Sequence, residues 1–261
     1  MISISAKAHD VAVENEDGVT IYYNFISGQT GLSVTYNDDT PFFKYTGNIK
    51  IPASVTIENV AYRVIDIGKN AFTSCKVTSV EIPSSITSIG EGAFKNCTYL
   101  TAVYITDMSA WLNIDFFGDL FWSGDRDVPI VSCYSNPLSY AHHLYLNGNE
   151  VTELKVPDDV TAIGDYAFFG CTGLTDVQIS SSVTTIGKYA FCNCTGLTSC
   201  QMPSGTTNNG EHLSLGTGAF RECYRLRSIY LSSTMPPYIA YHDVLGFFIP
   251  EEVGSVAKVR G

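Results

Sequence analysis

The stretch VTAIGDYAFFGCTGLTDVQIS, residues 160–180, is followed by VTTIGKYAFCNCTGLTSCQMP, residues 183–203, which repeats it closely. Three more segments share its Gly-x-x-Ala-Phe-x-x-Cys pattern. The aligned glycines are separated by 22, 74, 23 and 29 residues, and they are Gly68, Gly90, Gly164, Gly187 and Gly216. A recurring interval of about 23 residues is typical of a solenoid, in which each repeat forms one coil.

Each repeat predicts a short strand and a compact turn. In LTDVQIS, apolar Leu174, Val177 and Ile179 point inward, and the last two alternate with polar residues as a strand with one buried face requires. The Ala-Phe segment after each glycine predicts one helical turn. Because crossovers between parallel strands are right-handed, the pattern favours an α/β repeat solenoid, a right-handed superhelix with short parallel strands and short helical turns.

The repeated Phe and Cys positions are predicted to fill the core. Stacked coils lie about 4.8 Å apart, so the rings should form a column wherever coils adjoin: Phe72, Phe94, Phe168, Phe191 and Phe220. The cysteine three residues later should be a buried, apolar thiol, although disulfides or a metal site are alternatives: Cys75, Cys97, Cys171, Cys194 and Cys223. Cys200 replaces a strand Val and is assigned to the core. Cys133 and Cys192 lie off this ladder and are the better candidates for reactive thiols if they are exposed.

The combined pattern IGxxAFxxCxxLTxVxIPxSVTxIG resembles the BspA-like class of bacterial leucine-rich repeats. The resemblance covers roughly residues 64–106 and 151–233, and SNPLSYAHHLYLNGNEVTELKVP at 135–157 resembles a segment that recurs between repeats in that family. It implies a leucine-rich-repeat-like fold in a secreted or surface-displayed binding protein, with adhesion as the usual function. It implies no catalytic residues.

The segments around the repeats predict caps and an insertion. Residues 1–8 resemble the tail of a secretion signal, because Ala6-Lys7-Ala8 matches the small-residue pattern of a cleavage site. Residues 9–63 predict an N-terminal β cap with a first partial coil, since an open solenoid end must be covered. The solenoid is assigned to residues 64–233, with an irregular insertion at 107–150. Residues 234–261 predict a C-terminal cap or a truncated coil.

The insertion is aromatic and acidic, and two interpretations remain open. Its Trp111 and Trp122 belong either to an exposed patch that binds a partner or to irregular coils that lack the Phe column. Farther on, LYLNGNEV predicts a hairpin on an Asn-Gly turn. The adjacent His142 and His143 do not converge on a metal.

Composition excludes several functions. Twenty-six acidic residues against fifteen basic ones give a net charge of −11, which repels nucleic acid. The apolar stretches are far shorter than the ~20 residues that cross a bilayer. The chain has no G-x-S-x-G elbow, no Gly-rich phosphate loop and no H-E-x-x-H. We therefore expect no enzyme, no cofactor, no metal site and no membrane span.

The remaining hypothesis is binding through a long face of the solenoid. If the LTxVxI strands form its concave sheet, one outward row is predicted to contact the ligand: Glu81, Tyr104, Lys155, Gln178, Gln201 and Tyr230. We expect a secreted or cell-surface monomer whose partner is a host or bacterial surface protein or glycan. The alternative is a purely structural spacer or presentation module of a larger surface protein, with no ligand of its own.

Overall fold

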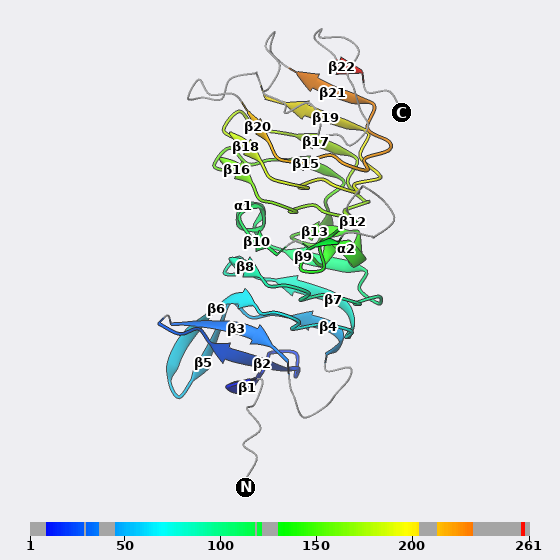
Figure 1. Ribbon diagram of the computed structural model, residues 1–261. Helices are drawn as coiled ribbons and strands as arrows, with labels where there is room; N and C mark the ends of the chain where they lie inside the picture. Colours follow the sequence, from blue (N-terminus) through cyan, green and yellow to red (C-terminus); the bar gives the residue numbers. More distant parts are fainter. Residues whose placement is uncertain are drawn as a thin grey trace.

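The computed structural model describes residues 9–28, 30–36, 45–117, 119–121, 130–203, 213–231 and 257–258. These residues form an elongated stack of coils, whose strands lie side by side from the N-terminal to the C-terminal end (Figure 1). The signal-peptide tail predicted for residues 1–8 lies outside the described residues. So does the C-terminal segment predicted for 234–261, apart from strand β22 (Ala257–Lys258).

The face that carries the LTxVxI strands is divided into two sheets. The N-terminal sheet has the order β14-β13-β9-β7-β4, and only β14 runs antiparallel to its neighbour. Its strands are β4 (Thr46–Lys50), β7 (Lys76–Ile82), β9 (Ala102–Ile105), β13 (Leu144–Leu146) and β14 (Asn149–Glu150). The C-terminal sheet has the order β15-β17-β19-β21-β22, and its first four strands are parallel. They are β15 (Glu153–Lys155), β17 (Asp176–Gln178), β19 (Ser199–Met202) and β21 (Ser228–Leu231).

A second pair of sheets forms the adjoining side of the stack (Figure 1). One joins β6 (Val60–Ile67), β8 (Ser88–Ile89) and β10 (Asp115–Phe116), and the other joins β16 (Ala162–Ile163), β18 (Thr185–Ile186) and β20 (Ser214–Leu215). The remaining elements are β5 (Ser54–Ile57), β11 (Asp119–Phe121), β12 (Ile130–Ser132) and the short helices α1 (Met108–Leu112) and α2 (Leu138–Ala141). The structure is therefore a strand-rich repeat fold with few helices. The handedness of its winding stays a prediction.

A three-stranded meander closes the N-terminal end. It contains β1 (Val11–Glu14), β2 (Thr20–Phe25) and β3 (Gly31–Thr35), and β3 pairs with β6 of the first coil. Tyr45 ties this cap to the core. Its hydroxyl donates to the Thr35 carbonyl at 2.7 Å, and its ring lies 4.8 Å from that of Phe72. Tyr45 therefore covers Phe72, the N-terminal ring of the column.

Consecutive β-turns replace the predicted helical turn of each coil. In the first coil, the amides of Ala71, Thr73 and Cys75 each donate to the carbonyl three residues earlier. The residue before each Ala and the residue before each Cys have positive φ, which a right-handed helix forbids and the third position of a type II turn requires. They are Asn70, Gly92, Tyr166, Tyr189 and Gly218, and Ser74, Asn96, Gly170, Asn193 and Glu222.

These turns leave alternate amides free to bond between coils. Phe72 N donates to Ala93 O at 2.7 Å, and Phe168 N donates to Ala190 O at the same distance. A helical turn would satisfy its amides internally, whereas this arrangement joins neighbouring repeat coils within each half of the stack. The turn region therefore stabilises the stack as the sheets do.

The ring column predicted from the sequence is confirmed within each half. The ring centroids of Phe72 and Phe94 lie 5.0 Å apart, and Phe191 lies 5.2 Å from both Phe168 and Phe220. All five rings are buried. The column is interrupted between Phe94 and Phe168, where the insertion supplies an irregular coil.

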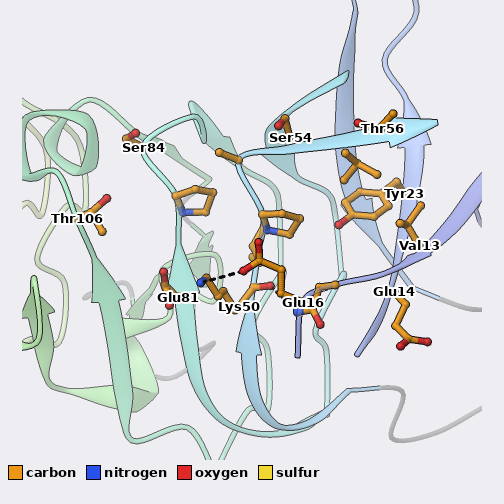
Figure 2. Close-up of a pocket in the computed structure, with 16 residues that line it drawn as sticks. Val13, Glu14, Glu16, Tyr23, Lys50, Ser54, Thr56, Glu81, Ser84 and Thr106 are labelled. Carbon is orange, nitrogen blue, oxygen red and sulfur yellow. Dashed lines mark hydrogen bonds and ion pairs between the residues drawn. The ribbon is translucent and has the colours of Figure 1, made fainter. Parts of the chain in front are cut away.

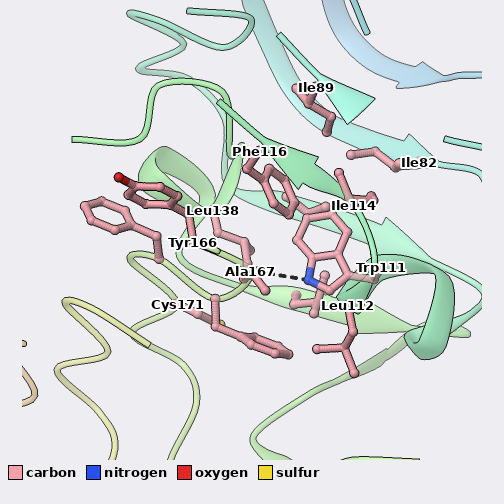
Figure 3. Packing of buried hydrophobic residues seen from close by; sticks show 14 of the residues in the cluster. Ile82, Ile89, Trp111, Leu112, Ile114, Phe116, Leu138, Tyr166, Ala167 and Cys171 are labelled. Atoms are coloured by element: carbon pink, nitrogen blue, oxygen red, sulfur yellow. Dashed lines mark hydrogen bonds between the residues drawn. The ribbon is translucent and has the colours of Figure 1, made fainter. Parts of the chain in front are cut away.

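Side chains replace the missing backbone bonds at this interruption, which we call the joint (Figure 3). Trp111 Nε1 donates to the Ala167 carbonyl at 3.0 Å, and Asn136 Nδ2 donates to the carbonyls of Tyr166 and Ala167 at 2.8 and 3.2 Å. In regular coils the Ala carbonyl accepts from the Phe amide of the preceding coil, as Ala93 O does from Phe72 N. The joint thus couples the two halves through two buried side chains and through backbone bonds from Gly164 N to Leu112 O at 2.9 Å and from Gly173 N to His142 O at 3.2 Å.

Candidate functional site

The structure places the six predicted row residues in register, but in two separate rows. On the N-terminal sheet, Glu81 pairs with Tyr104. On the C-terminal sheet, Lys155 pairs with Gln178, Gln178 with Gln201, and Gln201 with Tyr230. The hairpin β13–β14 ends the first row, so the continuous face expected from the sequence is divided between the two sheets.

Two members of the first row were missed. Lys50 pairs with Glu81 at one end, and Tyr145 pairs with Tyr104 at the other. Lys50 lies in the segment assigned to the cap, although Ile49 and Ile51 alternate around it as in a repeat strand. The sequence pattern identifies Tyr145 only as part of the Asn-Gly hairpin, which the structure confirms. Its strand LYL also has the alternation of a repeat strand, which was the available signal.

Two stacked tyrosines form the centre of the first row. The rings of Tyr104 and Tyr145 lie 4.9 Å apart at an interplanar angle of 29°, and both residues are half-buried. Glu150 pairs with Tyr145 across the hairpin, as Glu81 pairs with Tyr104. Desolvation, then the Glu150 carboxylate and then Tyr104 raise the pKa of Tyr145 above its usual range. Tyr104 and Tyr145, which we call the tyrosine pair, thus lie between Glu81 and Glu150, which we call its flanking acids.

Two grooves meet at Lys50 and Glu81 beside the tyrosine pair. One, of about 550 Å³, runs over β4, β7 and β9 and is lined by Asp17, Glu81 and Tyr104 among others. The other, of about 520 Å³, lies between the cap and the ends of β4 and β7, and it includes Glu14, Glu16 and Ser54 (Figure 2). Both volumes fall within the range of roughly 300–1,000 Å³ that ligand sites occupy.

The cap positions the wall of these grooves. Asn15 Nδ2 donates to the Lys50 carbonyl at 2.9 Å, which fixes the β1–β2 turn over the edge strand β4. Glu16 Oε2 then lies 3.7 Å from Lys50 Nζ (Figure 2). Both charged side chains are largely exposed, so this ion pair contributes little stability. Its effect is to hold an acidic turn beside the sheet.

The C-terminal sheet presents a different surface. Its first row consists of exposed Lys155, Gln178 and Gln201, and the parallel row beside it contains Glu153, Asp176 and Ser199. Asp176 accepts a short hydrogen bond from the Ser199 hydroxyl. The side chain of Tyr230 lies outside the described part of the molecule. Among the described side chains of β15, β17 and β19, none is aromatic.

The tryptophans of the insertion do not form the patch that one interpretation predicted. Trp111 is only 1% exposed and packs against Phe116 at 5.2 Å, so it belongs to the core. Trp122 lies outside the described residues. The packing interpretation is therefore correct for Trp111, and its buried indole N–H explains why the coil tolerates such a large side chain: the proton has a carbonyl partner.

All eight cysteines are buried and free. Repeat thiols donate to the Phe carbonyl of the preceding coil, as Cys97 Sγ does to Phe72 O at 3.0 Å and Cys194 Sγ does to Phe168 O at 3.1 Å. Desolvation raises the pKa of Cys97 to about 12 and that of Cys192 still higher. Since the thiolate is the reactive species, burial of Cys133 and Cys192 makes both of these candidate reactive thiols inert.

Neither histidine faces a metal cluster. His142 Nδ1 contacts the Gly170 carbonyl at 2.9 Å, whereas His143 Nδ1 contacts Glu150 Oε1 at 2.6 Å. Within the described ranges, no group of three or more His, Cys, Asp or Glu side chains could hold a metal ion. The helices in those ranges are too short or too polar to cross a membrane.

Comparison with known families agrees with this repeat geometry. The family described as BspA type leucine rich repeat region matches in six copies, over residues 42–119 and 141–240. The chain belongs to this family. The match begins near β4 and omits residues 120–140, so it covers repeats on both sides of the joint but not Asn136. No curated protein matches the chain.

Solved structures of bacterial leucine-rich repeat proteins resemble this one. A leucine rich cell surface protein from Faecalibacterium prausnitzii is 25% identical with a TM-score of 0.51, and the match covers 97% of this chain and 62% of that protein. This BspA-type chain thus spans about three fifths of that relative's length. The T. pallidum leucine rich repeat protein is 19% identical with a TM-score of 0.42, covering 82% of this chain and 91% of that one.

Proposed function

We propose that this BspA-type chain is a non-enzymatic binding module, secreted or displayed at the cell surface, that recognises a surface protein or glycan through its N-terminal sheet. The observation that carries the proposal is the tyrosine pair, which is half-exposed on a sheet face where two grooves meet. Tyrosine suits such a role because it offers a large contact area at a small cost in conformational entropy.

Three further observations support the proposal. Nucleophilic catalysis by a cysteine needs an accessible thiolate. The thiols of this chain are buried, and desolvation raises the pKa of Cys194, which keeps it protonated. The Faecalibacterium prausnitzii relative is a cell surface protein, which supports the same location here. The sheet is rigid because each strand is bonded to its neighbours, so little ordering is needed on binding. A monomer with right-handed winding, as expected from the sequence, completes the proposal.

The test compares two double variants on an array of host and bacterial surface proteins and glycans. We expect Tyr104→Ser with Tyr145→Ser to weaken capture of the array ligand by about tenfold or more, because both rings are lost from the centre of the site. The matched control is Gln178→Ser with Gln201→Ser on the C-terminal sheet, which should bind as the unaltered protein does. Equal capture by all three proteins would remove the tyrosine pair from the site.

The second candidate function is a structural spacer without a ligand. The polar row of the C-terminal sheet favours it for that half, because no described side chain of β15, β17 or β19 is aromatic. A folded protein that captures nothing on the array would support the spacer function.

A further inference from the structure

The N-terminal sheet carries a symmetrical arrangement of charge and aromatic surface. Across strands β7, β9, β13 and β14, the paired residues run Glu81, Tyr104, Tyr145 and Glu150. Neighbouring strands lie about 4.8 Å apart, so the two glutamates are separated by three strand steps, or about 14 Å. Two stacked rings with a carboxylate at each end therefore form a site with a defined length.

This arrangement fits the chemistry of arginine. A guanidinium group stacks on the face of a tyrosine ring and donates to a carboxylate in a planar, two-pronged geometry. Glu81 lies next to Tyr104, and Glu150 lies next to Tyr145, so each end offers one ring and one carboxylate. The Glu150 carboxylate is held in place by His143 Nδ1 at 2.6 Å.

The charge around the site also favours a cation. Of the residues that line the two grooves, Glu14, Glu16, Asp17 and Glu81 are acidic, and Lys50 is the single basic one. Lys50 is within 3.7 Å of Glu16, which offsets its charge. The whole chain carries a net charge of −11. A basic partner is therefore attracted over long range and an acidic one is repelled.

The length of the site sets the spacing of the cations. An extended peptide rises about 3.3 Å per residue and presents alternate side chains on one face. Four residues span about 13 Å, which matches the separation of the two glutamates. We propose that the N-terminal sheet binds an extended basic segment of a partner protein in which two arginines lie four residues apart. This inference rests on the proposed function and specifies its ligand as a cationic polypeptide, not a glycan.

The charged groups that face the site set the conditions for binding. The basic residues of its own sheet are Lys50 of β4 and Lys76 of β7, with His143 directly before β13, and the acidic turn Glu16–Asp17 faces it from the cap. Exposed ion pairs weaken as ionic strength rises, because counterions screen them within about 10 Å at 0.1 M salt. Affinity should therefore fall with added salt, while the ring contacts preserve part of it.

The experiment uses a fluorescent peptide of glycine and serine with two arginines four residues apart, and it measures anisotropy on the full chain. We expect Glu81→Gln with Glu150→Gln to weaken binding about fivefold to tenfold, since two exposed charge pairs are lost. The matched control removes the same charge from the C-terminal sheet by Glu153→Gln with Asp176→Asn. This control should bind almost as the unaltered protein does.

Peptide controls separate a specific site from general attraction to an acidic protein. Moving the arginines to two residues apart, or replacing them with citrulline, should reduce affinity to that of the Glu81→Gln, Glu150→Gln variant. Equal binding by the two charge-matched variants, or by the two arginine spacings, would overturn the inference. Absence of peptide binding would overturn it as well.

Failure of this inference is distinguishable from failure of the proposed function. A ligand captured on the array that needs Tyr104 and Tyr145 but is insensitive to Glu81→Gln with Glu150→Gln leaves the binding function standing and removes only the arginine ligand. Circular dichroism of every variant confirms that the fold is retained.

Discussion

The two sheets on the LTxVxI face share one core but present different surfaces. In both, Phe rings stack about 5 Å apart and cysteine thiols donate to Phe carbonyls of the preceding coil. Outside, the N-terminal sheet offers a tyrosine pair between two acids, whereas the C-terminal sheet offers lysine and glutamines. Inward positions are constrained by stacking on two neighbours, and outward positions are free to differ. Repetition therefore specifies the fold, whereas the outward surface is specific to individual coils.

The largest expected effect comes from breaking the joint between the halves. Trp111→Ala removes a buried indole and leaves the Ala167 carbonyl with only its longer bond from Asn136. We expect a loss of about 3–5 kcal/mol in the free energy of unfolding, as for other buried aromatic truncations. Because coils contact only their neighbours, the urea transition should split into separate steps for the two halves.

Truncation of an exposed ring provides the control for this experiment. Tyr99→Ala removes a side chain that is 56% exposed, and it should change the free energy of unfolding by less than about 0.5 kcal/mol. A single transition for Trp111→Ala, displaced no more than that of Tyr99→Ala, would show that the joint does not couple the halves.

A second prediction tests whether the halves share the same thiol environment. Desolvation raises the pKa of Cys97 and of Cys223 from 9.0 to about 12. As the pH rises, each thiol therefore ionises in the unfolded chain before it ionises in the folded protein. The contribution of the buried thiol to the free energy of unfolding is complete below pH 9. It is lost as the pH rises from about 9 toward 12, by about 1.4 kcal/mol per pH unit for each thiol.

Single alanine variants isolate this contribution from other titrating groups. Urea unfolding of Cys97→Ala and Cys223→Ala at pH 8 to 11 should show a shallower alkaline loss than the unaltered protein, and by similar amounts in the two variants. Curves parallel to that of the unaltered protein would contradict the buried thiol in that half.

The smallest effect concerns the hairpin that ends the N-terminal sheet. Gly148 has a φ of +81° and Gly28, in the β2–β3 turn, has a φ of +76°, with no atom close to an added Cβ at either. Alanine at each should cost about 1 kcal/mol, because L residues disfavour this conformation. We expect only Gly148→Ala to weaken peptide binding, since Tyr145 and Glu150 lie on its two strands. Equal weakening by Gly28→Ala would indicate a general loss of stability instead.

The features that recur in every repeat could be predicted from the sequence. The interval of about 23 residues is enough to place the Phe column, the buried cysteines and the register of the row, because identical coils must stack in register. The LTxVxI motif also placed Tyr104 in the predicted row. Lys50 and Tyr145 were missed because their segments, NIKIP and HLYLNG, do not match the LTxVxI motif from which the row was chosen.

The helical prediction for the turns was wrong for a local reason. Ala-Phe segments favour helix by composition, yet Asn or Gly occupies six of the ten positions before Ala and Cys, and all ten have positive φ. Asn and Gly tolerate that conformation best, so their recurrence was the signal for β-turns. The joint had no comparable signal. Trp111 and Asn136 are 25 residues apart in sequence and meet only because the coil between them folds back.

The hairpin of β13 and β14 also determines how such a molecule can change in length. It terminates one sheet, so the register of the next sheet starts afresh at Glu153. Coils beyond the one that carries Tyr166 and Ala167 can therefore be duplicated or deleted without changing the partners of any side chain before the boundary. The N-terminal sheet can in this way keep its dimensions while the number of C-terminal coils, and with it the length of the solenoid, varies.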